Sequence, residues 1–72
     1  MSDYSDGTFQ HRLRNLRKER GWSQRVVAGK LSISHGSYGI YEKHAEPRFT
    51  NLVKIAELFG VTVDFLLGLS DE

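Results

Sequence analysis

The sequence contains no cysteine, which excludes disulfide bonds and zinc sites made of thiolates. It also lacks an apolar run long enough to cross a lipid bilayer, and its polar beginning, MSDYSDG, does not have the pattern of a secretory signal peptide. The one proline, Pro47, marks a point through which no helix is expected to pass. These absences favour a cytoplasmic protein.

A chain of 72 residues makes one small domain with a modest core. Its formal net charge is only +1, but the charges are unevenly distributed. All ten lysines and arginines lie between Arg12 and Lys54, and residues 8–54 hold three acids against these ten bases, a formal charge of +7. A basic centre between acidic ends is typical of a face that binds phosphates, although composition alone fits a solvated surface of mixed charge equally well.

Apolar spacing predicts five helices and no strand. They are expected over about residues 9–20, 24–31, 35–43, 49–59 and 63–67. Expected helix caps are Asp6 or Thr8, Ser23, Ser34 and Thr62, and expected helix ends are Gly21, Gly60 and Gly68. The apolar residues of the fourth helix are Phe49, Leu52, Ile55, Ala56 and Phe59. We expect a disordered leader over residues 1–7, a domain over 8–69 and a tail over 70–72.

The stretch from Ser23 to Lys43 divides at Ser32 into two short amphipathic helices. Apolar residues share one face in each half: Val27, Ala28 and Leu31 in the first, Tyr38 and Tyr41 in the second. Two such helices joined by a tight break form a helix-turn-helix. The turn requires a left-handed backbone at Ser32, a conformation that glycine would adopt at lower cost.

This stretch resembles the DNA-binding unit of the Cro/CI-type (Xre-like) repressors of phages and bacteria, and the resemblance extends over about residues 9–68. The matching residues are Leu16, Arg17, Gly21, Ser23, Gln24, Ala28, Leu31, Ile33, Ser34, Tyr41, Glu42, Pro47, Leu52, Ile55, Ala56, Gly60, Val61, Asp64, Leu66, Leu67 and Gly68. The resemblance implies an all-α, five-helix, lambda-repressor-like DNA-binding domain with its helix-turn-helix at the second and third helices. It also implies sequence-specific binding of double-stranded DNA by a transcriptional regulator of the repressor kind.

In such a protein the third helix enters the major groove, and two copies bind a near-palindromic operator about 34 Å apart. The residues expected to face the bases are Ser34, His35, Gly36, Ser37, Gly39 and Ile40. The residues expected to contact phosphates are Gln24, Arg25, Lys43 and His44. Gln24 resembles the family's phosphate-binding glutamine at the start of the second helix. We expect the two sets to have different effects. The phosphate contacts should supply affinity for any duplex, and the base contacts should supply preference for one DNA sequence.

The expected base-facing surface has an unusual composition. It carries no Arg, Asn or Gln, the side chains best suited to bidentate base contacts, and it holds two glycines in one helix. Each glycine costs about 1 kcal/mol relative to alanine. Either the glycines allow the helix to approach the groove closely, with Ile40 against thymine methyls and His35 on a base edge, or the helix is weak and its readout poor.

Two further sets of residues are predicted to make structural contacts. Arg17 and Glu42 match family positions that form an ion pair, and each has an apolar neighbour in the sequence. The short fifth helix cannot bury all of its apolar residues within one monomer. The sequence therefore predicts weak homodimerisation through some of Val63, Leu67 and Leu69. Because this apolar patch is small, pairing is expected to depend on DNA.

Other classes of function have less support in the sequence. No cluster of nucleophile, base and orienting residue indicates an enzyme. No cofactor is implied, and no metal site is expected, because His11, His35 and His44 come from three segments without paired spacing. The main alternative is an antitoxin-like or other protein-interaction module that uses the same fold.

Overall fold

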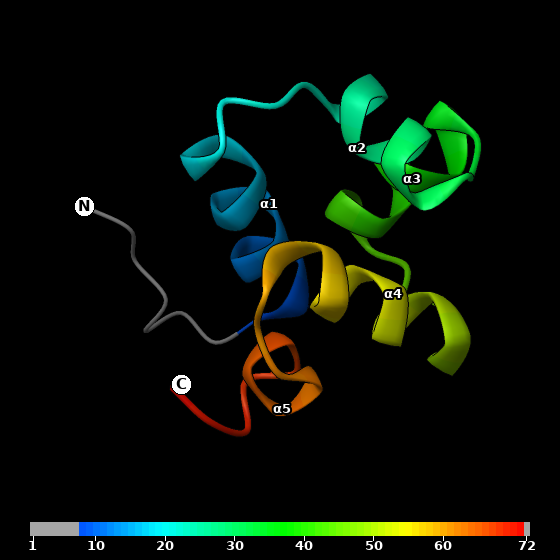
Figure 1. The fold of residues 1–72 in the computed structure, drawn as a ribbon. Coiled ribbons are helices and arrows are strands. Elements are labelled where there is room, and N and C mark those ends of the chain that lie inside the picture. Colours follow the sequence, from blue (N-terminus) through cyan, green and yellow to red (C-terminus); the bar gives the residue numbers. More distant parts are fainter. Residues whose placement is uncertain (1–7, 72) are drawn as a thin grey trace.

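The computed structural model describes residues 8–71, which form five α-helices and no strand within that range (Figure 1). The helices are α1 (Phe9–Glu19), α2 (Gln24–Leu31), α3 (His35–Lys43), α4 (Phe49–Phe59) and α5 (Val63–Leu66). The predicted all-α class and the order of the five helices are confirmed. The expected disordered leader and the candidate cap Asp6 lie outside the described residues, as does Glu72 at the end of the expected tail.

Four helices begin at a side-chain cap. In each, a hydroxyl oxygen accepts a hydrogen bond of 2.9–3.1 Å from the backbone N–H three residues later, which satisfies a donor that the helix itself leaves unpaired. The capping residues are Thr8, Ser23, Ser34 and Thr62. The exception is α4, where Arg48 occupies the cap position without a side-chain bond. The caps predicted for α2, α3 and α5 are therefore confirmed.

The turn between α2 and α3 has the left-handed backbone that the sequence predicts at Ser32 (φ 59°, ψ 39°). Ser32 is the one non-glycine residue with positive φ among residues 8–71. The backbone N–H of Ile33 donates to the carbonyl oxygen of Ala28 at 3.0 Å, which closes the end of α2. Ala28, near the end of α2, is buried in the core, so a larger side chain there would have to displace its neighbours.

The core gathers residues from all five helices. Its buried apolar members are Phe9, Leu13, Leu16, Val27, Ala28, Leu31, Tyr38, Leu52, Ile55, Ala56, Phe59, Phe65 and Leu66. Phe49 is an exception to the predicted apolar face of α4, because it is 73% exposed. It stands in the first turn of that helix, where no neighbouring helix covers it. Arg12 is the opposite exception, a charged residue that is only 2% exposed.

Trp22 lies half-buried at the connection between α1 and α2. Its ring centroid is 5.9 Å from that of Phe59, near the end of α4. Two cations lie over the indole, the Arg20 guanidinium at 5.6 Å and the Lys30 ammonium at 4.7 Å. Arg20 also donates to the carbonyl oxygen of Phe59 at 2.8 Å. The stack therefore joins the α1–α2 connection to α4.

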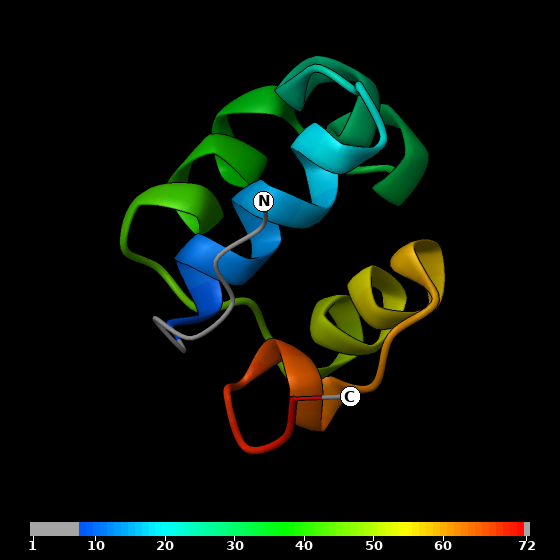
Figure 2. The same cartoon turned by 90° about the vertical axis from the view of Figure 1, so that its left-hand side faces the viewer.

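The arrangement of the helices separates α3 from α5. Figures 1 and 2 show α3 and α5 at different ends of the molecule, with α1 running between them. Helix α1 packs against both, and α4 packs against α2 and α5. The exposed surfaces of α3 and α5 can therefore each contact another molecule at the same time. None of the helices within residues 8–71 is long and apolar enough to span a membrane.

Candidate nucleic-acid interface

The residues predicted to face DNA bases lie on one side of α3. Ser34, His35, Gly36, Ser37 and Ile40 are exposed, and Gly39 is half-buried. We call these six residues the α3 face. The opposite side of the helix is closed by Tyr38, which is fully buried, and by Tyr41, which packs against the core. The helix is thus fixed by one side and presents the other to solvent.

Two hydroxyls of the α3 face are occupied within the helix. Ser34 Oγ accepts from the backbone N–H of Ser37 at 3.1 Å and donates to Ser37 Oγ at 2.9 Å. These bonds hold the first turn of α3, so a base contact by Ser34 would compete with its cap. Among the remaining members, Ile40 is 44% exposed and His35 is exposed. His35 and Ile40 are therefore the side chains of this face best placed to reach a base.

The packing of the monomer does not require the two glycines of the α3 face. A Cβ atom added to Gly36 would have no neighbour within 4 Å, and one added to Gly39 would meet only Gln24 Oε1 at an ordinary 3.6 Å. Alanine would fit at both positions and favour the helix by about 1 kcal/mol each. The reason for the glycines therefore lies outside the monomer's own packing, or the helix is simply weak.

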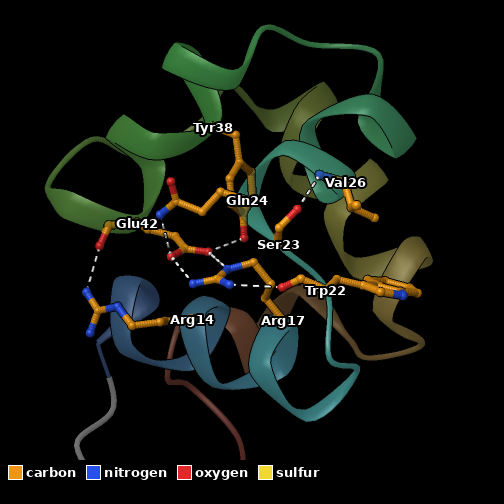
Figure 3. A network of polar contacts seen from close by, with 8 residues as sticks. All are labelled: Arg14, Arg17, Trp22, Ser23, Gln24, Val26, Tyr38 and Glu42. Carbon is orange, nitrogen blue, oxygen red and sulfur yellow. Dashed lines mark hydrogen bonds and ion pairs between the residues drawn. The ribbon is translucent and has the colours of Figure 1, made fainter.

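Behind the α3 face lies a buried cluster centred on Glu42, which is 2% exposed (Figure 3). Arg17 of α1 approaches it with two nitrogens: Nε lies 2.6 Å from Oε2 and Nη2 lies 3.1 Å from Oε1. Tyr38 Oη donates to Oε2 at 2.5 Å, and Gln24 Nε2 donates to Oε1 at 3.0 Å. These four residues, which we call the Glu42 network, include the ion pair that the sequence predicts.

The protonation states in the Glu42 network follow from these contacts. Burial would raise the pKa of Glu42, but the hydrogen bonds from Arg17 and the other donors outweigh burial, so its pKa lies below the usual value. The hydrogen bond to Glu42 raises the pKa of Arg17. Burial, reinforced by Glu42, raises the pKa of Tyr38. At neutral pH the cluster therefore holds a carboxylate, a guanidinium and a neutral phenol.

Polar side chains of α1 also hold the end of α3 and the loop after it. Arg14 Nη2 donates to the carbonyl oxygen of Glu42 at 2.9 Å, and Gln10 Nε2 donates to that of Ala45 at 3.1 Å. These two contacts were not predicted from the sequence. A signal exists, because Gln10, Arg14 and Arg17 are spaced i, i+4 and i+7 on one helical face beside the apolar row.

The predicted phosphate-contacting residues have different surroundings. Arg25, Lys43 and His44 are exposed at the start of α2 and the end of α3. Gln24 is half-buried, and its amide nitrogen is bound to Glu42. The structure therefore brings Gln24 together with α3 through the Glu42 network.

The predicted dimer residues lie around α5. Leu67 is 39% exposed and Leu69 is 75% exposed, whereas Val63 is partly buried and packs against the core. An apolar surface is therefore present at this end of the molecule, supplied mainly by the two leucines.

Arg12 fixes the segment that carries this apolar surface. Its Nη1 donates to the carbonyl oxygens of Phe65 and Ser70, both at 3.0 Å, and its Nη2 lies 3.3 Å from Asp71 Oδ1. Its guanidinium carbon lies 4.6 Å from the centre of the Phe65 ring. This role of Arg12 was not predicted from the sequence. The available signal was that Arg12 interrupts the apolar row of Phe9, Leu13 and Leu16.

Comparison with known proteins gives several matches. Residues 13–66 match the family model described as Helix-turn-helix. The chain is similar to "Uncharacterized HTH-type transcriptional regulator YobD" of Bacillus subtilis (strain 168), with 42% identity over 65 residues, or 89% of this chain and 58% of that protein. It is also similar to "HTH-type transcriptional regulator ImmR" of the same strain, with 34% identity over 58 residues, or 79% of this chain and 46% of that protein.

A third relative is "Cryptic phage CTXphi transcriptional repressor RstR" of Vibrio cholerae, with 31% identity over 64 residues, or 88% of this chain and 58% of that protein. The chain thus spans about half the length of the curated relatives it matches. No solved structure matches it significantly.

Proposed function

We propose that this chain binds double-stranded DNA and regulates transcription. It belongs to the helix-turn-helix family of the Cro/CI (Xre-like) type. One observation carries the proposal. Helix α3 is anchored by buried Tyr38 and Glu42 on one side, while its other side, the α3 face, is exposed. A single exposed helix surface on a fixed base suits insertion into the major groove, where each base pair presents its own pattern of donors and acceptors.

In this proposal the α3 face reads the bases. Ile40 contacts thymine methyl groups, and the imidazole of His35 hydrogen-bonds a base edge. The phosphates on either side are contacted by Gln24 and Arg25 at the start of α2 and by Lys43 and His44 at the end of α3. The relative RstR is named a transcriptional repressor, which supports repression rather than activation as the effect on transcription.

We further propose that two copies bind one near-palindromic operator. The exposed leucines Leu67 and Leu69 would meet across a two-fold axis, with Val63 beside them. Because α3 and α5 lie at different ends of the molecule (Figure 2), this contact leaves the α3 face open. The apolar surface is small, so we expect pairing to become measurable mainly on DNA. Sedimentation with a duplex of two half-sites tests the stoichiometry, and a strictly 1:1 complex would contradict the dimer.

The decisive experiment for DNA binding is selection of bound duplexes from a random pool. We expect enrichment of a sequence with two related half-sites whose centres are about 34 Å apart. A variant carrying His35→Ala and Ile40→Ala should enrich no sequence while still binding DNA at low salt. Failure of the parent protein to bind any duplex at low salt would overturn the proposal and favour the protein-interaction alternative.

A further inference from the structure

We infer that the side chain of Gln24 belongs to the surface that reads DNA bases, where its amide oxygen accepts a hydrogen bond from the amino group of an adenine or a cytosine. The inference rests on the proposed DNA binding. It adds one residue of α2 to the six residues of the α3 face, and it names the kind of base group that this residue prefers.

The hydrogen bond to Glu42 fixes which end of the Gln24 amide faces the protein. Gln24 Nε2 donates to Glu42 Oε1 at 3.0 Å (Figure 3). The carboxylate is paired with Arg17 and can only accept hydrogen bonds, so the amide nitrogen must point toward it. The two ends of an amide point in different directions. The amide oxygen is therefore turned away from Glu42.

The oxygen end of this amide is open to a hydrogen-bond donor. Among residues 8–71, none donates a hydrogen bond to Gln24 Oε1, although Gln24 is half-buried. Oε1 is also not a buried atom. Solvent therefore reaches this oxygen, and a donor on a bound molecule can take the place of that solvent.

Gly39 places this oxygen beside the α3 face. A Cβ atom added to Gly39 would meet Gln24 Oε1 at 3.6 Å and no other atom within 4 Å. The missing side chain of Gly39 thus leaves a gap on α3, and the Gln24 amide oxygen lies next to it. The α3 face itself carries no Arg, Asn or Gln. Gln24 supplies from α2 the amide group that α3 lacks.

A hydrogen-bond acceptor at this place distinguishes among bases. The donors in the major groove are the N6 amino group of adenine and the N4 amino group of cytosine, whereas guanine and thymine present acceptors. Phosphate oxygens are acceptors as well, so Gln24 Oε1 repels them. The phosphate contact proposed for Gln24 then belongs to its backbone N–H, because the first residue of a helix has no acceptor for that group within the helix.

The contact from Gln24 refines the sequence preference that His35 and Ile40 set. One neutral hydrogen bond contributes about fivefold in affinity. His35 and Ile40 fix the register of α3 in the groove, so without them Oε1 meets no single base pair. The preference due to Gln24 is therefore expected at one base pair of each half-site.

Base analogues that lack only the amino group test the inference. An operator is first selected with the parent protein from a random pool. Each adenine of a half-site is then replaced by purine and each cytosine by 2-pyrimidinone, one base at a time. We expect one of these replacements to weaken binding of the parent about fivefold. The same replacement should leave binding of Gln24→Met almost unchanged, because this variant has no amide oxygen to lose a partner.

Tyr38→Phe is the matched control, because it and Gln24→Met each remove one hydrogen bond donated to the Glu42 carboxylate. Tyr38→Phe leaves the Gln24 amide in place, so the same base replacement should still cost it about fivefold. All variants are first shown to be folded by circular dichroism, and Gln24→Ala takes the place of Gln24→Met if the latter does not fold. Loss of the effect in Tyr38→Phe as well would show that loosening of the Glu42 network is responsible, and would overturn the inference.

The remaining outcomes separate this inference from the proposed function. If no base replacement has a cost that depends on Gln24, the base contact is wrong while DNA binding stands. A loss of affinity in Gln24→Met that is equal for every duplex also overturns it, because the side chain then contacts a phosphate. A parent protein that binds duplexes without enriching any sequence contradicts it too. If the parent binds no duplex at low salt, both the inference and the proposed function fail.

Discussion

Gln10 Nε2 donates to the carbonyl oxygen of Ala45 across 3.1 Å, which joins the first turn of α1 to the loop after α3. The loop begins beside Lys43 and His44, two of the proposed phosphate contacts. Because Gln10 is uncharged, replacing it alters the position of the loop without changing the net charge of the protein. Substituting Gln10 therefore separates the effect of loop position on DNA binding from the effect of the protein's charge.

We expect Gln10→Ala to weaken binding to all duplexes by a similar factor. Release of the loop should cost one phosphate contact and flatten the dependence of the logarithm of affinity on the logarithm of salt concentration by about one unit. A salt titration on operator and random duplexes gives both quantities. An unchanged slope would mean that the loop is positioned by other contacts.

The second prediction concerns the stability of the Glu42 network. Glu42→Ala leaves the Arg17 guanidinium without its partner in a site where its side chain is only 13% exposed. We expect the free energy of unfolding to fall by about 3–5 kcal/mol. For a domain of this size the melting temperature should drop by more than about 10 °C. Glu46→Ala removes an exposed acid nearby and should change stability by less than about 0.5 kcal/mol. Similar melting temperatures for both variants would contradict the buried ion pair.

The third prediction is the acid dependence of folding. The folded-state pKa of Glu42 lies below its usual value of 4.5, so the carboxylate stabilises the fold above pH 4.5. This contribution is lost as the pH falls through 4.5 toward the lowered folded-state pKa. Denaturant titrations between about pH 6 and pH 3 should show a shallower loss of stability in Glu42→Gln than in the parent. Glu46→Gln, at an exposed site, should keep the parent's pH dependence.

The fourth prediction separates the two explanations of the glycines in α3. Gly36→Ala should raise the free energy of unfolding by up to about 1 kcal/mol, because its added Cβ meets nothing within 4 Å. We expect the same variant to bind the operator more weakly, because the methyl group would stand between α3 and the groove. Gly29→Ala is the control, since its Cβ also meets nothing but lies on α2. It should stabilise the fold and leave operator affinity unchanged. Tighter binding by Gly36→Ala would favour the weak-helix explanation instead.

The fifth prediction assigns affinity and preference to different residues. Arg25→Ala should weaken binding to operator and random duplexes alike and flatten the salt dependence by about one unit. Ile40→Ala should narrow the ratio between the two affinities while leaving most nonspecific binding intact. His35→Ala should reduce that ratio by an amount equivalent to about 1–3 kcal/mol. An unchanged ratio in both α3 variants would mean that α3 is not the helix that reads the sequence.

Features that depend on near neighbours in the sequence were predicted correctly. The caps Ser23, Ser34 and Thr62 and the left-handed Ser32 depend on backbone groups within a few residues, so sequence pattern is enough to find them. The pairing of Arg17 with Glu42 spans 25 positions. It was predicted from a family resemblance, because periodicity indicates faces of helices but does not pair residues so far apart.

Contacts that depend on the reach of long side chains were not predicted. Arg12, Gln10 and Arg14 bind carbonyl oxygens whose positions are set by how α1 packs against α3 and α5. Phe49 was placed on the apolar face of α4 but is exposed. The spacing of apolar residues predicts which face of a helix a residue lies on, but it does not show whether another helix covers that position. Which residues of the α3 face contact bases depends on the partner molecule and remains a prediction.

The contacts of Trp22 with Phe59, Arg20 and Lys30 have a spectroscopic consequence. Trp22 is the only tryptophan in the sequence, so selectively excited fluorescence comes from one site, the joint between the α1–α2 connection and α4. Its emission would record loosening of that joint as a red shift when water reaches the indole. Because the indole is not part of the α3 face, a change in emission on adding DNA would reveal movement transmitted through the scaffold.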